Sequence, residues 1–179
     1  VLKDIIDSKA FSEVRISKIY RQAESSHIVL NAHKINAGEL ITLDNKNKDF
    51  FFFEKKDVRT VRGALVYLVK TRLPEHIGAS PFEIQVLTPM RKGELGVEHL
   101  NEVLQYYLNP ASESKKEKEG RTGVFREGDK VMQVKNNYKL EWKITNAKGF
   151  SIEEGLGVFN GDMGIIKQIN TYSERITVV

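Results

Sequence analysis

The stretch "GVFNGDMGIIKQI", Gly157 to Ile169, indicates how the second half of this chain folds. Asn160 and Gly161 stand between two apolar runs, and both residue types tolerate the positive φ of a tight hairpin turn. The flanking runs have the length of short strands. We therefore expect a β-hairpin with its turn at Asn160 and Gly161.

The same pattern of short strands and Gly-Asp turns continues on both sides of this hairpin. The turn "REGD" precedes "DKVMQVK" at residues 129–135, and "RITVV" follows at residues 175–179. Short strands separated by turn residues are typical of small sandwiches and barrels. Residues 125–179 are therefore expected to form a small β-barrel portion.

The preceding segment differs sharply in composition. Residues 109–123, "NPASESKKEKEGRTG", carry no apolar side chain beyond Ala111. Such a polar stretch is typical of loops and linkers. We expect a linker or mobile loop at residues 111–124, with a domain boundary between Pro110 and Phe125.

The first half alternates predicted strands and helices. Candidate strands lie at residues 13–20, 49–55 ("DFFFFEK") and 82–90 ("FEIQVLTPM"), and the last has the continuous apolar character of a central parallel strand. The predicted helices span residues 1–8, from Ser26 to Gly38, from Asp57 to Pro74, and 97–108. This alternation favours βαβ units, so residues 1–110 are predicted to be an α/β domain with a layered parallel sheet.

Composition excludes several classes of protein. The chain has 179 residues, is 40% hydrophobic, carries a net charge of +4 and contains no cysteine. Disulfides and thiolate sites are therefore excluded, and the four histidines show no H-x-x-x-H pairing. Without a long apolar run or a signal peptide pattern, a cytoplasmic protein is expected. Because the chain begins with Val1 and ends in a predicted strand, we expect a piece of a longer protein.

Two residues at a predicted strand-to-helix turn are suited to contact an anion. Tyr20 and Arg21 stand side by side just before the second predicted helix, where a guanidinium can reach a phosphate. A surface arginine paired with Glu13 or Glu24 is the alternative. The chain contains no G-x-x-x-x-G-K-[ST] phosphate loop, so any nucleotide that Arg21 contacts must be bound mainly by other residues.

Three further groups have side chains suited to nucleic acid, although each also has an ordinary structural explanation. Thr88, Arg91 and Lys92 follow the predicted central strand, at the carboxyl end where α/β sheets bind ligands; a plain solvated loop is equally compatible. The other two groups carry side-chain amides beside a histidine or an aromatic ring, and such side chains can hold single-stranded nucleic acid. Adjacent asparagines are, however, also common in ordinary turns. The residues of these two groups are Asn31, His33, Asn136, Asn137 and Tyr138.

Four ordered blocks together resemble one known family. "VLKDIIDS", "IYRQAESSHIVLNAHKIN", "IQVLTPMRKGELGVEHLNEVLQ" and "FREGDKVMQVKNNY...GVFNGDMGII" resemble RecD-like ATP-dependent DNA helicases of superfamily one, the exodeoxyribonuclease V alpha-subunit family. The resemblance weakens over residues 109–123 and over 139–156, which has the character of a variable insertion.

The resemblance implies a fold and a set of roles. Residues 1–110 would form part of the second RecA-like motor domain, of the P-loop NTPase type, and residues 125–179 part of an SH3-like barrel. Arg21 would reach the γ-phosphate of ATP from across a cleft, and Tyr20 would lie near the adenine. Thr88 and Arg91 would contact DNA phosphates. ATP and Mg²⁺ would be bound mainly by a first motor domain that this chain lacks.

The function implied is 5′-to-3′ DNA unwinding in repair and recombination, with single-stranded DNA, the rest of the helicase chain and other repair subunits as partners. The chain alone is not expected to hydrolyse ATP. Two alternatives remain open: a non-enzymatic nucleic-acid-binding module, and a nuclease. A nuclease would need clustered carboxylates, for which Glu153, Glu154 and Asp162 are the candidates.

Overall fold

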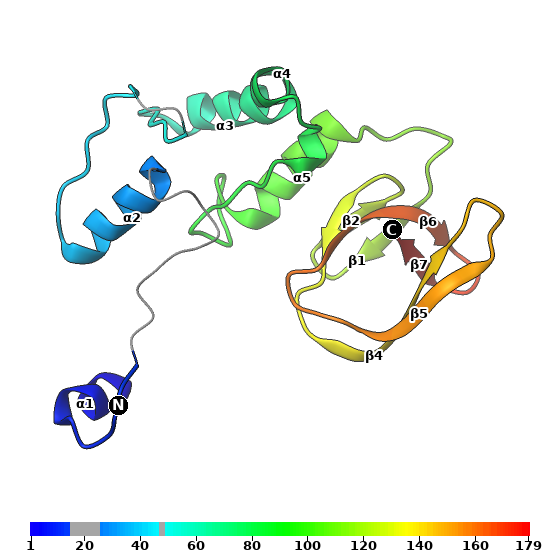
Figure 1. Cartoon of the computed structure of the whole chain (residues 1–179). Helices are drawn as coiled ribbons and strands as arrows, with labels where there is room; N and C mark the ends of the chain where they lie inside the picture. Colours follow the sequence, from blue (N-terminus) through cyan, green and yellow to red (C-terminus); the bar gives the residue numbers. More distant parts are fainter. Residues whose placement is uncertain (15–25, 47–48) are drawn as a thin grey trace. The chain divides into compact units, whose positions relative to one another are not determined.

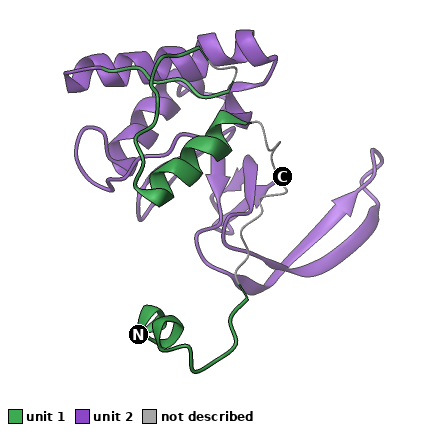
Figure 2. Ribbon diagram, turned by 60° about the vertical axis from the view of Figure 1, so that its left-hand side comes forward, with its two compact units in different colours: residues 1–54 green, residues 55–179 purple. Residues whose placement is uncertain are grey.

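The computed structural model describes residues 1–14, 26–46 and 49–179. The chain divides into two compact units, Val1–Glu54 and Lys55–Val179, which Figure 2 colours separately. Among the described residues, every strand lies in the second unit and follows the last helix, as Figure 1 shows. None of the described helices combines the length and the apolar character needed to cross a membrane.

The first unit contains two predicted helices. These are α1 (Leu2–Ser8) and α2 (His27–Ala37). As expected, α2 begins directly after Ser26 and ends at Gly38, whose φ of 77° suits a residue without a Cβ. The His27 amide donates to the Asp49 carboxylate at 3.2 Å. A hydrogen bond from the Ser26 side chain lowers the pKa of Asp49, so this carboxylate satisfies the start of the helix in its charged form.

The helical part of the second unit is built around a helix with a wide turn. It comprises α3 (Val58–Tyr67), η1 (Leu68–Arg72), α4 (Leu73–Ile77), η2 (Pro81–Glu83) and α5 (Val97–Leu108). Asp57 caps α3 by accepting from the Thr60 amide at 2.9 Å, and hydrogen bonds from Thr60 lower the pKa of Asp57.

The helix was expected to end near Pro74, but it continues to Ile77. Segment η1 is a π-turn in which the Leu73 amide donates to the Leu68 carbonyl, five residues back. Proline lacks an amide hydrogen, and in a regular α-helix its ring clashes with the carbonyl four residues earlier, here that of Lys70. The wider π-turn accommodates Pro74 without ending the helix.

The strands form three small antiparallel sheets, with orders β1-β2, β3-β6-β7 and β4-β5. They are β1 (Glu117–Gly120), β2 (Gly123–Arg126), β3 (Lys130–Met132), β4 (Asn137–Thr145), β5 (Ser151–Val158), β6 (Met163–Asn170) and β7 (Arg175–Val178). Ile166 and Ile169 of β6 are the most deeply buried side chains among the described residues. They lie three apart and would face opposite sides of a regular strand, but a register shift between Ile166 and Gln168 lets both be buried.

The predicted parallel RecA-like sheet is wrong for the described residues. Residues 49–55 and 82–90 contain no strand, and every strand pairing that the structure describes is antiparallel. An apolar run becomes a central strand only when strands on both sides accept its backbone hydrogen bonds. No such neighbours form here, and Phe53 and Leu87 are accordingly exposed. The predicted strand at residues 13–20 lies mostly outside the described residues.

The turn at Asn160 and Gly161 is confirmed, but the predicted hairpin is wrong. The Asp162 amide donates to the Phe159 carbonyl at 3.0 Å, and Gly161 has a φ of 99°. The strands on either side separate, because β5 pairs with β4 whereas β6 pairs with β3 and β7. The Gly161 amide instead donates to the Gln133 carbonyl at 2.9 Å. The turn therefore passes the chain from one sheet to another.

Strands also form in the expected linker and in the segment that resembles a variable insertion. Strand β1 lies inside the expected linker at residues 111–124, and the segment resembling a variable insertion forms the two-stranded β4–β5 ribbon. In that ribbon Trp142 lies opposite Gly155, where a Cβ would approach the indole ring to 2.5 Å. The indole ring of Trp142, the chain's one tryptophan, therefore packs directly against the backbone of Gly155.

Substituting Gly155→Ala tests this contact. We expect the new methyl to displace the indole and to lower the free energy of unfolding by about 1 kcal/mol, the lower end of the usual cost of overpacking. The measurement is tryptophan emission, which should move to longer wavelength as the ring becomes more exposed. Ser151→Ala on the same strand is the control. An unchanged spectrum for Gly155→Ala would contradict the packing described.

Candidate nucleic-acid interface

The predicted nucleotide-contacting residues, Tyr20 and Arg21, lie outside the described residues. Their roles stay predictions.

The two candidates on α2 do not share one surface. Asn31 is buried, with 6% of its surface exposed, and its amide nitrogen has no hydrogen-bond partner among the described residues. His33 is exposed and stands two positions further along the helix. Residues two apart on an α-helix point in different directions. The structure therefore does not bring Asn31 and His33 together.

The loop at residues 88–96 uses most of its polar groups internally. The half-buried Thr88 hydroxyl donates to the Leu95 carbonyl at 2.7 Å. The amides of Val97 and Glu98, the first two of α5, donate to the carbonyls of Met90 and Arg91 at 3.0 and 3.2 Å. The start of this helix, which could otherwise receive a phosphate, is thus closed by its own loop.

Close packing of this loop depends on Gly96. Gly96 is buried, and a Cβ there would lie 2.5 Å from the Lys92 carbonyl carbon and oxygen. Lys92 itself is exposed, and the Arg91 Nε donates to Glu98 at 3.0 Å across the surface. Exposed pairs of this kind are weak. Arg91 and Lys92 are therefore the cationic side chains that this loop exposes at its surface.

The third predicted group is brought together with residues from a distant part of the chain. We call Asn136, Asn137, Tyr138, Phe159 and Asn160 the aromatic corner. The Asn160 amide donates to the Asn136 side-chain oxygen at 2.8 Å, and the Asn136 Nδ2 contacts the Tyr138 hydroxyl at 3.1 Å. The Tyr138 and Phe159 rings meet edge to face, with centroids 5.7 Å apart. The start of β4 is thus fixed against the end of β5.

The aromatic corner combines order with exposure. Tyr138 is 67% exposed and Phe159 is 45% exposed. Asn137 accepts from the Lys139 amide at 3.2 Å, which is local turn chemistry. Exposed rings held in place beside side-chain amides are the groups on which single-stranded bases stack.

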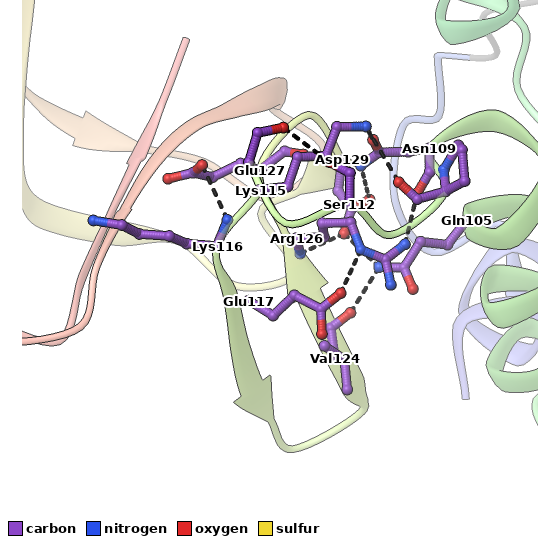
Figure 3. A network of polar contacts seen from close by, with 12 residues as sticks. Gln105, Asn109, Ser112, Lys115, Lys116, Glu117, Val124, Arg126, Glu127 and Asp129 are labelled. Atoms are coloured by element: carbon purple, nitrogen blue, oxygen red, sulfur yellow. Dashed lines mark hydrogen bonds and ion pairs between the residues drawn. The ribbon is translucent and has the colours of Figure 1, made fainter.

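A buried polar network holds this β-rich region to α5, as Figure 3 shows. The Asp129 carboxylate accepts from the Asn109 Nδ2 at 2.7 Å, the Gln105 Nε2 at 2.6 Å and the Arg126 amide at 2.7 Å. Asn109 and Asp129 are 5% and 9% exposed. We call these residues, with Glu127, the α5 anchor. Its five residues come from the end of α5, the end of β2 and the turn between β2 and β3.

Two charged side chains extend the α5 anchor. The Arg126 guanidinium donates to the Asn109 carbonyl at 2.6 Å and to Glu117 at 2.6 Å. The Glu127 carboxylate accepts from the amides of Ile169 and Lys116, and these hydrogen bonds lower the pKa of Glu127 below its usual value. The anchor thereby connects α5, β1 and β6 through one turn.

Sequence reasoning missed the α5 anchor. Gln105 and Asn109 stand four apart near the end of the predicted helix, on one face, and Asn109 precedes Pro110. Such a pair can satisfy a buried carboxylate, but the sequence alone does not connect it with the "REGD" turn some twenty residues later.

Comparison with known proteins extends these observations. Residues 100–179 match the family model described as the SH3 domain of ATP-dependent RecD-like DNA helicases. These residues are therefore similar in sequence to that SH3 domain. Over 171 residues the chain is 32% identical to the ATP-dependent RecD2 DNA helicase of Deinococcus radiodurans, covering 96% of this chain and 20% of that relative. The resemblance to RecD-like helicases is therefore confirmed.

The matched segment, residues 100–179, includes both sides of the α5 anchor. The match begins at residue 100, inside α5, rather than near Phe125 where the sequence pattern changes. Asn109 and Asp129 consequently lie within one matched segment. The matched segment thus contains the C-terminal half of α5 together with the strands.

Substituting Asn109→Ala tests the α5 anchor. The change removes the amide that donates to Asp129 and to the Glu127 carbonyl. Leaving a buried acceptor without its donor costs about 1–3 kcal/mol, so the free energy of unfolding should fall by about that amount. The measurement is urea denaturation. The exposed Ser112→Ala is the control, and equal midpoints for Asn109→Ala and wild type would contradict the assignment.

Proposed function

We propose that this chain is a DNA-contacting part of an ATP-dependent 5′-to-3′ DNA helicase. The observation that carries the proposal is the RecD-like SH3 domain at residues 100–179, with exposed rings and amides gathered at its aromatic corner. The relative that covers most of the chain is itself described as a DNA helicase.

The aromatic corner is suited to unpaired bases. The contact with Phe159 and the hydrogen bond with Asn136 hold the Tyr138 ring in place without covering it. An ordered ring loses little conformational freedom on binding, and base stacking on an aromatic side chain contributes about 1–3 kcal/mol per base. Every base has a face that can stack, so this site would bind without strong sequence preference, as a translocating enzyme requires.

The loop before α5 would supply phosphate contacts. Arg91 can exchange its exposed partner Glu98 for a phosphate oxygen, and Lys92 stands beside it. Thr88 would act by holding the loop in shape, since its hydroxyl is already bonded to Leu95. Asn31 and His33 remain DNA-contact predictions without a shared surface.

Hydrolysis of ATP would require residues beyond this chain. The sequence has no phosphate loop, so a first motor domain would bind ATP and Mg²⁺. Arg21 would approach the γ-phosphate from the other side of the cleft and Tyr20 would lie near the adenine. The chain alone would then be inactive as an ATPase. Action in DNA repair and recombination, in the cytoplasm and with other repair subunits, belongs to the same proposal.

The DNA-binding part of the proposal is tested with Tyr138→Ala. We expect affinity for labelled oligo-dT to fall about 5- to 150-fold, the equivalent of one lost stacking contact. Fluorescence anisotropy at several salt concentrations measures it, and Tyr138→Phe, which keeps the ring but loses the hydrogen bond with Asn136, should lose much less affinity. Tyr172→Ala is the matched control, because Tyr172 is 99% exposed. Unchanged binding by Tyr138→Ala would refute the role of the aromatic corner.

The catalytic part is tested with Arg21→Ala in a protein that joins this chain to a first motor domain carrying the phosphate loop. Arginines that reach a transferring phosphoryl group contribute about 10³- to 10⁵-fold to its rate. We expect DNA-stimulated ATP hydrolysis to fall at least about a hundredfold, with DNA affinity little changed. Equal ATPase rates for the variant and wild type would show that Arg21 is an ordinary surface arginine.

A further inference from the structure

A cationic groove lies between the helix formed by α3 and η1 and the helix α5, and its lining contains none of the candidate DNA-contact residues discussed above. Its volume is about 510 Å³, which falls in the range of small-ligand sites. Its lining includes Arg59, Arg62, Tyr67, Lys70, Thr71 and Tyr107.

The charge of the groove is of one sign. Three of its lining side chains are cationic, and no acidic side chain of the described residues lines it. The nearest acid to Arg62 in an ion pair is Glu94, at 3.8 Å, and the Glu94 side chain is mostly exposed. Arg62 also lies 3.3 Å from the His99 ring. Exposed pairs are weak, so the groove keeps most of its attraction for an anion.

The π-turn supplies two of the groove's residues. Lys70 and Thr71 belong to η1, whose wider turn rotates them relative to a regular α-helix. π-turns within α-helices are frequently found at functional sites. Pro74 accounts for where the turn forms, and its result is that a cation and a hydroxyl enter the same groove.

Two tyrosine rings give the groove an aromatic character as well. The Lys70 ammonium lies 5.8 Å from the centre of the Tyr107 ring, within range of a cation–π contact. Tyr106 meets Tyr107 edge to face at 5.1 Å and restricts its orientation. Tyr67 and Tyr107 are nevertheless about half exposed. The orientation of the Tyr107 ring is therefore restricted, and both rings remain accessible.

From these features we infer that the groove binds one nucleotide unit of a single-stranded nucleic acid, with its phosphate on the cations and its base on a tyrosine. Cations and a threonine hydroxyl are phosphate ligands, and exposed rings are stacking surfaces. An acidic peptide would use the cations but would leave the rings without a role. The groove is a second contact, and it does not depend on the aromatic corner.

The charge part is tested with the double variant Arg59→Gln/Lys70→Gln. Two lost phosphate contacts should reduce the log-log salt slope of oligo-dT binding by about 1.4, since each contributes about 0.7 for single strands. Lys148→Gln/Lys167→Gln removes the same net charge elsewhere and is the control. An equal slope change in both double variants would overturn the site, because the effect would then follow net charge alone.

The stacking part is tested with Tyr67→Ala and Tyr67→Phe. We expect Tyr67→Ala to weaken oligo-dT binding about 5- to 150-fold and Tyr67→Phe to retain it. Far-ultraviolet circular dichroism checks that each variant is folded. Thymidine monophosphate as competitor distinguishes a free nucleotide from a strand: displacement at equal concentration would overturn the assignment to a strand.

Two results separate this inference from its alternatives. Competition by poly-glutamate that equals competition by oligo-dT, with no effect of Tyr67→Ala, would identify an acidic-peptide site and overturn the inference. Combining Tyr67→Ala with Tyr138→Ala separates the two contacts. Independent sites should lose affinity additively in free energy, and loss from Tyr138→Ala alone would refute the groove while leaving the proposed function intact.

Discussion

The second unit depends on the hydrogen bonds that the buried Asp129 carboxylate accepts. Three nitrogen donors surround it, from Asn109, Gln105 and the Arg126 backbone. The apolar core beside it is small, because only Ile166 and Ile169 are fully buried among the described strands. Where so little apolar surface is removed from water, a satisfied polar network fixes the geometry that packing alone would leave loose.

The small apolar core also bears on which parts of the fold the sequence could predict. The helices at residues 2–8, 27–37 and 97–108 depend on local periodicity and end signals such as Gly38, and these are visible in the sequence. Strands β3, β6 and β7 were likewise foreseen from short apolar runs between turns. The runs at residues 49–55 and 82–90 could not be judged locally, since a strand needs partners that sequence pattern does not specify.

The candidate sites divide in a similar way. Asn136 and Tyr138 were identified from their residue types, but their contact with Phe159 and Asn160 depends on a turn that joins two sheets. Thr88 was expected at a DNA contact, yet its hydroxyl is used by its own loop. The cationic groove and the α5 anchor escaped notice because each combines residues from helices or turns far apart in the chain. The residue types in both sites are common ones. What identifies each site is that these residues lie close together in the structure.

Hydrogen bonds with neighbouring segments fix both ends of helix α5. The carbonyls of Met90 and Arg91 hold its first turn, and the side chains of Gln105 and Asn109 hold its last. Twelve residues at 1.5 Å each make it a strut about 18 Å long. The loop at residues 88–96 and the turn between β2 and β3 are therefore joined through this one helix.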